Sequence, residues 1–329
     1  MSSVLLFSLT FALTLIMTVT LIRILLPVLR RHHVGQRILE IGPAWHRAKE
    51  GTPTMGGIAF VLASLLALLV AGPLLAKALP PLFWRPLLFT FLYAICNAAV
   101  GLVDDMTKFR KDQNEGLTPA QKLILQISFS ILYLTILRIY GYIDTSVYIP
   151  YLDRVWELGN FFYPFAIILS VGMVNCVNLS DGVDGLASGT AFVYAAFFAI
   201  AAVLLSEPTS LLLATAMMGA CLGFLFFNRH PARLFMGDTG SLFLGAMAIG
   251  CAFLIGNPLL SVVVGAVYVL EGVSVLLQVF WYKTTGKRLF RMAPFHHHLE
   301  KCGYSENKIV LLFICIALLS AGIAAFGLQ

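Results

Sequence analysis

The stretch ASGTAFVYAAFFAIAAVLLSEPTSLLLATAMMGACLGFLFF, residues 187–227, decides the fold class of this chain. It contains two long runs of apolar and small residues without a charge, and Glu207 and Pro208 separate them. An α-helix needs about 20 predominantly apolar residues to cross the hydrocarbon core of a bilayer. The stretch therefore predicts two consecutive membrane-spanning helices, at residues 187–206 and 209–227.

The composition of the whole chain supports the same class. Of its 329 residues, 59% are hydrophobic and only 12% are charged, whereas a soluble domain is about a quarter charged. Too few charges remain to cover a globule of this size, which excludes a soluble enzyme, a disordered chain and a disulfide-stapled secreted domain. The six cysteines lack CxxC spacing, so they are predicted to be small buried hydrophobic side chains.

Further apolar runs extend this pattern along the chain. Their continuity favours helices over the alternating strands of a barrel. The predicted fold class is an all-α polytopic membrane protein, a single domain over residues 1–329 with about ten spans. The predicted spans are 4–29, 55–76, 86–103, 120–140, 161–178, 187–206, 209–227, 241–256, 258–282 and 308–327.

Basic residues are distributed unequally between the two sets of loops. The loops after the first, third, seventh and ninth spans hold seventeen Lys and Arg, and the opposite loops hold three: Lys77, Arg85 and Arg154. Basic residues collect on the cytoplasmic side of membrane proteins, so we expect the odd-numbered loops inside and both termini outside. The rule also explains the basic excess without a nucleic acid partner. The outer loop 141–160, rich in aromatic and β-branched residues, predicts a small hairpin.

Residues capable of chemistry are concentrated on that cytoplasmic side. All seven histidines lie in the cytoplasmic loops, and so do five aspartates: Asp104, Asp105, Asp181, Asp184 and Asp238. A pore would need polar groups at several depths of the membrane. This one-sided arrangement instead predicts an active-site cleft that opens to the cytoplasm at the membrane boundary.

Asp104 and Asp105 follow the third apolar run, where we expect a helix C-terminus. The helix macrodipole disfavours negative charge at that end, so a cation is expected nearby. Successive helical side chains diverge by about 100°. One carboxylate would therefore face an ion or substrate, and the other a partner such as Lys108. The alternative is that the pair only marks the membrane edge.

A group of amides and carboxylates closes the fifth run. If the turn is helical, Asn175, Asn178 and Asp181 share one face at i, i+3 spacing, and Asp184 continues it. Gly182 lets backbone approach a ligand closely. We expect substrate binding here, with a polar helix end as the alternative.

Two later loops contribute further polar groups. Asp238 is a candidate N-cap of the eighth span, and a helix N-terminus presents free N–H groups to phosphate. His296, His297 and His298 are consecutive, so they point in different directions on a helix and lack the HExxH spacing of a zinc site. We expect them to donate to phosphate or sugar oxygens. Glu271 lies within the ninth run, where a lone acid is costly and usually buried or paired; support of the cytoplasmic cleft and a bond to a neighbouring helix are its two alternatives.

Carboxylates and amides without thiolates suit a hard cation. Mg²⁺ typically takes one or two carboxylates together with substrate phosphates. Lys49, beside the Gly- and Thr-rich segment 51–57, would add a cation that holds an anion. The set predicts a reaction between a soluble phosphorylated donor and a phosphorylated or hydroxylated lipid, in which positioning and charge neutralisation dominate catalysis.

Five motifs carry a family resemblance: GTPTMGG, VDDMTKFRK, NCVNLSDGVDGLASG, NRHPARLFMGDTGSL and APFHHHLEKCGYSE. With them the chain resembles the phospho-N-acetylmuramoyl-pentapeptide transferases, of the polyprenyl-phosphate N-acetylhexosamine-1-phosphate transferase superfamily. The resemblance implies Mg²⁺-dependent transfer of phospho-MurNAc-pentapeptide from UDP-MurNAc-pentapeptide to undecaprenyl phosphate, giving lipid I and UMP. It also implies a ten-span fold in the bacterial cytoplasmic membrane, often as a homodimer.

The resemblance assigns roles to individual residues. It implies that Asp238 binds Mg²⁺ and that Asp104, Asp105 and Asp238 form the catalytic centre. The uracil would lie beside Asp184 and Phe235. The rest of the nucleotide site would be lined by Lys49, Thr54, Asn178, Asp181 and Asn228. Phosphates and sugar would be contacted by Lys108, Lys122, His297 and His298.

Three alternative functions share part of this sequence pattern. The nearest is a related transferase that uses UDP-GlcNAc, because the acidic motifs are shared across the superfamily. A CDP-alcohol phosphotransferase is suggested by the DG-rich stretch Asp181–Gly185 but lacks the further Arg and Asp residues of that motif. A transporter is disfavoured by the one-sided chemistry.

Overall fold

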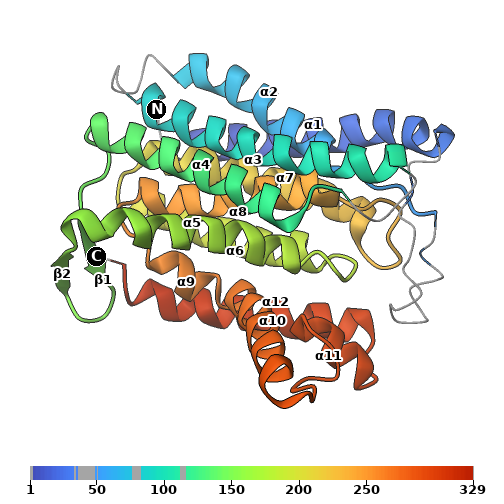
Figure 1. Ribbon diagram of the computed structural model, residues 1–329. Coiled ribbons are helices and arrows are strands. Elements are labelled where there is room, and N and C mark those ends of the chain that lie inside the picture. The colour runs from blue at the N-terminus through green and yellow to red at the C-terminus, as the bar shows by residue number, and fades with distance from the viewer. Residues whose placement is uncertain are drawn as a thin grey trace.

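The computed structural model describes residues 3–32, 35, 49, 51–75, 83–111 and 116–328. Within these residues the chain forms an assembly of α-helices with one β-hairpin, and most helices run side by side (Figure 1). In chain order the elements are α1 (Ser3–Arg31), α2 (Gly57–Leu75), α3 (Trp84–Lys111), α4 (Pro119–Ile139), β1 (Ser146–Ile149), β2 (Arg154–Glu157), η2 (Gly159–Phe161), α5 (Phe162–Leu179), α6 (Leu186–Leu204), α7 (Pro208–Asn228), α8 (Gly237–Leu254), α9 (Leu260–Val264), α10 (Ala266–Thr285), α11 (Phe295–Lys301) and α12 (Glu306–Ala325).

The described helices confirm the prediction of a helical polytopic membrane protein. Large apolar side chains are exposed on them, for example Leu88 (61%), Ile168 (72%) and Leu319 (68%), as expected of surfaces that face lipid. A shorter apolar stretch, Gly57–Pro73, lies on α2. Among the described residues, eight helices are long and apolar enough to cross a membrane: Phe7–Arg31, Trp84–Phe109, Pro119–Ile139, Gly159–Leu179, Leu186–Leu204, Pro208–Asn228, Gly237–Leu254 and Glu306–Ala325.

The predicted span 258–282 is wrong as a single helix. The chain there forms two helices, α9 and α10, on either side of Gly265. A Cβ atom at Gly265 would lie 2.5 Å from Ser261 O and 3.0 Å from Met173 Cε on α5. The missing side chain thus lets the chain bend close to α5.

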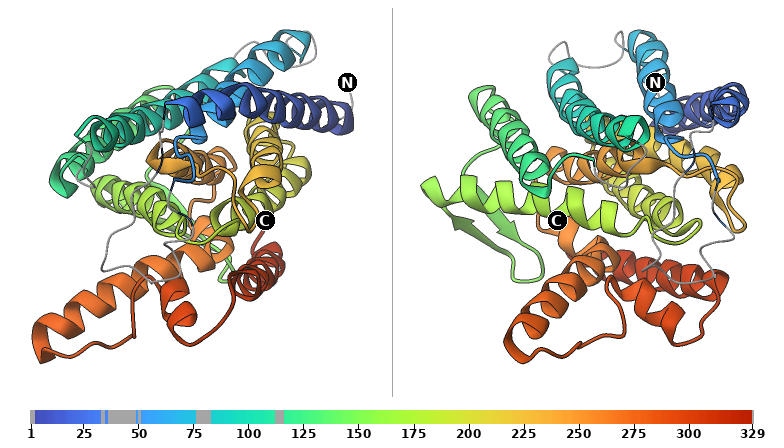
Figure 2. Two further views of the ribbon diagram at one scale, coloured as in Figure 1. Left: turned by 90° about the vertical axis from the view of Figure 1, so that its right-hand side faces the viewer. Right: turned by 45° about the vertical axis from the view of Figure 1, so that its right-hand side comes forward.

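Figure 2 shows α10, α11 and α12 grouped on one side of the other helices.

The predicted helix end at Asp104 and Asp105 is also wrong. α3 continues to Lys111, so both aspartates lie inside the helix. The apolar run stops at residue 103. Hydropathy therefore located the point where charged side chains begin, whereas the helix continues beyond it with exposed apolar side chains at Met106 and Phe109.

α8 occupies the centre of the assembly. Every residue from Thr239 to Phe253 on this helix is buried, and α2, α3, α5 and α7 pack against it. Glycines allow the closest approaches near its first turn. A Cβ atom at Gly57 would lie 2.4 Å from Gly240 Cα, and one at Gly101 would lie 2.2 Å from Asp238 O. The backbones of α2 and α3 therefore meet the very start of α8.

The hairpin predicted for residues 141–160 is confirmed. β1 and β2 pair antiparallel, with Ser146 opposite Glu157 and Ile149 opposite Arg154. Tyr151 Oη in the connecting turn donates a hydrogen bond to Ile323 O on α12 at 3.1 Å.

Several residues used to predict sidedness or the cytoplasmic group of histidines lie outside the described residues, namely His33, Arg37, His46, Arg47 and Lys77.

Candidate active site

Two carboxylates and two ammonium groups meet beside the first turn of α8. Lys122 Nζ on α4 lies 2.9 Å from Asp104 Oδ2 and 2.6 Å from Asp238 Oδ2. Lys108 Nζ, one turn after Asp104 on α3, lies 2.6 Å from Asp104 Oδ2 and 3.4 Å from Asp238 Oδ2. The cation expected beside the aspartate pair is therefore present as two lysines.

Asp105 holds the start of α8 in place. Its Oδ1 accepts the backbone N–H of Asp238 at 3.1 Å, and its Oδ2 accepts the Thr239 backbone N–H at 3.0 Å and hydroxyl at 2.7 Å. The first N–H groups of a helix have no partner within the helix, so Asp105 supplies one from α3. Asp238 lies within the first turn, and Met236 occupies the N-cap position, which corrects the N-cap prediction for Asp238.

Gly237 makes this contact possible. Its φ is +71°, and a Cβ atom there would lie 2.6 Å from Asp105 Oδ2. Any other residue would combine left-handed backbone strain with a clash against the carboxylate. Glycine therefore brings α3 and the start of α8 together.

Asp238 is the more accessible carboxylate of the pair that contacts the lysines. Its side chain is 18% exposed, whereas that of Asp104 is 0% exposed. Asn178, near the end of α5, donates from Nδ2 to Asp238 Oδ1 at 3.1 Å and to Ser241 Oγ at 2.8 Å. Asp238 thus lies where α3, α4, α5 and α8 converge.

The three aspartates form a group able to hold a metal ion. Oxygen atoms of Asp104, Asp105 and Asp238 lie within 4.8 Å of one another. Carboxylate oxygens are ligands that Mg²⁺ prefers. Asp105 uses both oxygens on the first turn of α8, and Asp104 Oδ1 accepts the Leu117 N–H at 2.7 Å. The Oδ2 atoms of Asp238 and Asp104, which face the lysines, are therefore the better candidates for ligands.

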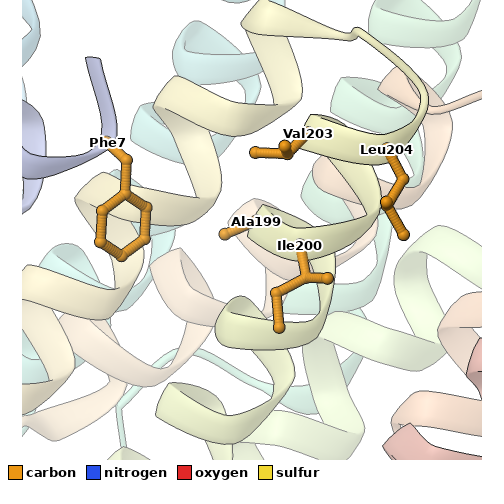
Figure 3. Close-up of a pocket in the computed structure, with 5 residues that line it drawn as sticks. All are labelled: Phe7, Ala199, Ile200, Val203 and Leu204. Carbon is orange, nitrogen blue, oxygen red and sulfur yellow. The ribbon is translucent and has the colours of Figure 1, made fainter. Parts of the chain in front are cut away.

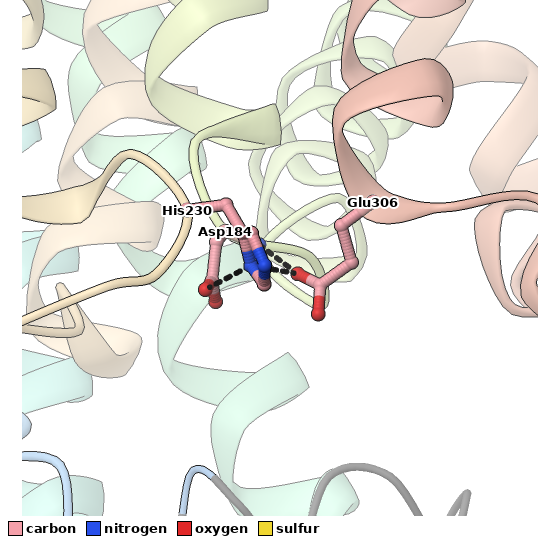
Figure 4. A group of neighbouring side chains, drawn as sticks. All are labelled: Asp184, His230 and Glu306. Atoms are coloured by element: carbon pink, nitrogen blue, oxygen red, sulfur yellow. Dashed lines mark hydrogen bonds and ion pairs between the residues drawn. The ribbon is translucent and has the colours of Figure 1, made fainter.

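A second charged cluster surrounds Lys49. Lys49 Nζ lies 2.7 Å from Asp184 Oδ1 and 2.7 Å from Glu306 Oε2. His230 Nδ1 lies 3.1 Å from Asp184 Oδ2 and 3.6 Å from Glu306 Oε2. Figure 4 shows Asp184, His230 and Glu306 directed toward one another from the turn before α6, the loop after α7 and the start of α12. These three side chains could hold a metal, but the Lys49 ammonium already contacts both carboxylates and compensates one of their two charges.

Glu306 was missed by sequence reasoning. It is the first residue of α12 and follows Ser305, the N-cap residue. Besides Lys49, its Oε2 accepts the backbone N–H of Asp184 at 3.1 Å. The only signal in the sequence is its place at the end of the APFHHHLEKCGYSE motif.

Asp181 lies in the turn between the two clusters. Burial raises the pKa of its carboxyl group well above the usual value, and the negative charges of Asp238, Asp105 and Asp184 raise it further. Lys49 opposes this shift only in part. Of the charged groups that shift this pKa, three are carboxylates and one is an ammonium group, which favours binding of a further cation.

Backbone pairing brings Thr54 and Phe235 together. Phe235 N donates to Pro53 O at 2.8 Å, and Gly56 N donates to Phe235 O at 2.8 Å. Both Thr54 and Phe235 are half-buried. The segment that opens α2 thus lies along the loop that leads into α8.

Asn228 connects neighbouring loops. Its Oδ1 accepts the Gly185 N–H and the Ser188 hydroxyl, both at 3.1 Å, and its Nδ2 donates to Leu234 O at 3.1 Å. It is 2% exposed. These contacts hold the turn before α6 against the loop that leads to α8.

The predicted single stripe through Asn175 is only partly formed. α5 ends at Leu179, so the helical face does not continue to Asp181 and Asp184. Asn178 reaches Asp238, whereas Asn175 Nδ2 donates to Gln126 Oε1 on α4 at 2.7 Å and to Val171 O at 2.8 Å. The structure therefore places Asn175 in a helix–helix contact.

The three consecutive histidines have different surroundings. His296 is 0% exposed, and its Nδ1 lies 3.2 Å from Glu271 Oε2. His297 Nδ1 pairs with Glu300. His298 Nδ1 accepts the Arg291 backbone N–H at 3.1 Å. In the part of the chain that the structure describes, neither group able to hold a metal contains one of these histidines.

An apolar pocket lies away from these polar groups. Figure 3 shows its lining by Phe7 of α1 and by Ala199, Ile200, Val203 and Leu204 of α6. It offers no polar side chain for binding phosphate or a metal. The chemistry therefore belongs to the two charged clusters and the turn that joins them.

Comparisons with known proteins indicate a family for the chain. Residues 87–256 match the family described as glycosyl transferase family 4, and residues 49–61 match a phospho-N-acetylmuramoyl-pentapeptide-transferase signature. A relative of that name from Caldanaerobacter subterraneus subsp. tengcongensis is 39% identical over 322 residues, 97% of this chain and 98% of the relative. Another from Heliobacterium modesticaldum is 44% identical over 304 residues, 90% of each chain. A third from Bacillus subtilis is 42% identical over 307 residues, 93% of each chain.

Proposed function

The chain belongs to the phospho-N-acetylmuramoyl-pentapeptide transferase family, and from that membership we propose its reaction. It transfers phospho-MurNAc-pentapeptide from UDP-MurNAc-pentapeptide to undecaprenyl phosphate. The products are lipid I and UMP. An oxygen of the acceptor phosphate forms a bond to the sugar-side phosphorus of the donor, and the bond from that phosphorus to the oxygen of UMP breaks.

The observation that carries this proposal is the alternation of carboxylates and ammonium groups around Asp238. The reaction brings two anionic phosphates together, so charge neutralisation is the main requirement. Lys108 and Lys122 have side chains 36% and 22% exposed, which leaves their ammonium groups accessible to phosphate oxygens. We assign both lysines to that role.

Asp238 and Asp104 would hold Mg²⁺, and the carboxylate-rich donor set fits this hard cation. When bound, the ion would neutralise charge on the phosphates. Asp105 has the separate role of fixing Asp238 through the first turn of α8. The acceptor is a phosphate monoester with a second pKa of about 6. Because it is largely dianionic at pH 7, no strong general base is required.

The nucleotide end of the donor belongs near Lys49. Lys49, Asp184 and Glu306 form one charged cluster. Thr54 lies shortly after Lys49 in the sequence, and backbone hydrogen bonds pair its segment with that of Phe235. We propose that the uracil and ribose bind here, with Asp181 and Asn178 toward the diphosphate. His297 would contact the phosphate or sugar side of the donor.

The same family membership supports the wider arrangement. We propose one transferase domain over the whole chain, with ten spans, both termini outside and the site open to the cytoplasm. The host would be the bacterial cytoplasmic membrane and the active form a homodimer.

Release of UMP tests the proposed function. The protein in liposomes with undecaprenyl phosphate and Mg²⁺ is supplied with UDP-MurNAc-pentapeptide or with UDP-GlcNAc, and UMP is measured. We expect UMP from the pentapeptide donor. Consumption of UDP-GlcNAc alone would assign the chain to the related GlcNAc-1-phosphate transferases instead.

A further inference from the structure

Glu271 and His296 form a buried acid–histidine pair behind the charged clusters. Both residues are 0% exposed, Glu271 on α10 and His296 on α11. The Glu271 carboxylate accepts the His296 backbone N–H, at 3.3 Å to Oε1 and 3.4 Å to Oε2. Its Oε2 also lies 3.2 Å from the ring Nδ1. One carboxylate therefore binds the His296 backbone and faces its ring, whose two nitrogens have no hydrogen-bond partner among the described residues.

The opposite edge of the imidazole meets Gly182. A Cβ atom at Gly182 would lie 2.2 Å from His296 Nε2 and 2.8 Å from Cε1. Glycine is thus required at this position by the space that the ring occupies. The ring is held between the Glu271 carboxylate and the turn after α5.

That turn carries two residues of the charged site. Asp181 precedes Gly182 and lies close enough to Asp238 and Asp105 for their charges to raise its pKa. Asp184 follows two residues later and pairs with Lys49. A movement of the imidazole would therefore move both carboxylates relative to Asp238.

We propose that Glu271 is a positioning residue, which holds the His296 ring against Gly182 and so sets the position of the Asp181–Asp184 turn. This inference rests on the proposed transferase function. His296 is completely buried, so it acts through this contact and does not touch the substrate. The role of the first histidine then differs from that of His297, which is half-buried.

Two substitutions disturb the same contact from opposite sides. Glu271→Gln keeps the shape and one acceptor oxygen but removes the charge that faces the ring. Gly182→Ala pushes the ring and the turn apart by about 1 Å, and a misplacement of that size costs about 100-fold in rate. Glu207→Gln removes a half-buried carboxylate at the start of α7 and serves as the matched control.

The kinetic test is a double-mutant cycle on kcat for UMP release per folded molecule. We expect each single variant to have a kcat about 100-fold lower than the unmodified protein. The kcat of the double variant should be no lower than that of the less active single variant, because both substitutions displace the same ring. The control should stay within twofold of the unmodified protein. Multiplied losses in the double variant, or unchanged kcat in folded Glu271→Gln, would overturn the proposal.

Hydrogen exchange gives a readout that does not depend on activity. In Glu271→Gln, amide exchange should accelerate in residues 180–186 as well as 293–300, whereas a merely local structural role would change only 293–300. If Glu271→Gln does not fold, Glu271→Asp, which keeps the charge on a shorter side chain, is measured in the same two ways. Absence of UMP release from the unmodified protein would refute the proposed function but would leave this exchange test decisive for Glu271.

Discussion

Asp105 on α3 accepts the backbone N–H of Asp238 on α8 at 3.1 Å, so one aspartate fixes the other. The neighbouring Asp104 instead contacts Lys108 and Lys122. Two adjacent carboxylates thus have different tasks, one holding a helix terminus and one sharing charge with the site. This division follows from the angle of about 100° between successive helical side chains.

Asp105→Asn should weaken this connection. The asparagine amide keeps one acceptor oxygen. Its NH₂ group would face N–H or O–H donors of Asp238 or Thr239, which now donate to the carboxylate. A hydrogen bond to a charged group contributes about 2 kcal/mol, so we expect a lower unfolding temperature in detergent and turnover reduced about tenfold or more. Unchanged stability and turnover would show that Asp105 does not hold α8.

Lys122→Gln should lower turnover without raising the Mg²⁺ requirement. Lys122 contacts both Asp104 and Asp238, and its loss removes an ammonium group that neutralises phosphate while leaving the carboxylates free for the ion. We expect kcat about 10- to 100-fold lower. Titration of Mg²⁺ against UMP release measures both quantities. Lys308→Gln, an exposed lysine on α12, is the control, and an equal effect there would contradict a specific role.

Glu306→Gln should impair donor binding more than the chemical step. The substitution removes one of the two carboxylates that hold Lys49, an interaction of about 1–2 kcal/mol. We therefore expect the KM for the nucleotide donor to rise roughly tenfold and kcat to change little. Asp144→Asn in the hairpin region is the control. A fall in kcat at constant KM would place Glu306 in the chemistry instead.

Asp181→Asn should make stability less dependent on pH. A carboxyl group whose pKa is raised in the folded protein binds more protons folded than unfolded, so its contribution lowers stability as pH rises above about 4. Without Mg²⁺, the variant should unfold at a higher temperature than the unmodified protein at pH 7–8. The difference should vanish near pH 4. A variant less stable at neutral pH would contradict the raised pKa.

Most of the fold could be predicted because long apolar runs indicate membrane-spanning helices, whether these face lipid or lie buried in the assembly as α8 does. Two boundaries could not. α3 continues past Val103 to Lys111 although its apolar run stops, because charged residues such as Asp104 and Asp105 do not interrupt helical hydrogen bonding. The break at Gly265 depends on the approach of Met173 from α5, a contact that no local pattern encodes.

The site was predictable in its chemistry but only partly in its arrangement. The family resemblance pointed to Asp238, Lys122 and Asn178, and the structure brings Lys122 and Asn178 into contact with Asp238. Glu306 escaped because its partner Lys49 lies 257 residues earlier. The sequence predicts that all three histidines donate to phosphate or sugar oxygens, whereas burial separates His296 from the other two. Such differences arise from tertiary packing, which residue spacing does not reveal.

We propose that Asp238 anchors a magnesium-dependent phosphoryl-transfer site. The turnover of Asp238→Asn is the direct test of this role. UMP release from UDP-MurNAc-pentapeptide, with undecaprenyl phosphate, is measured across a Mg²⁺ titration for the variant and the unmodified protein. We predict Mg²⁺-dependent turnover in the unmodified protein and a loss of roughly 100-fold or more in a variant that remains folded. Full Mg²⁺-dependent turnover by folded Asp238→Asn would show that Asp238 does not anchor this site.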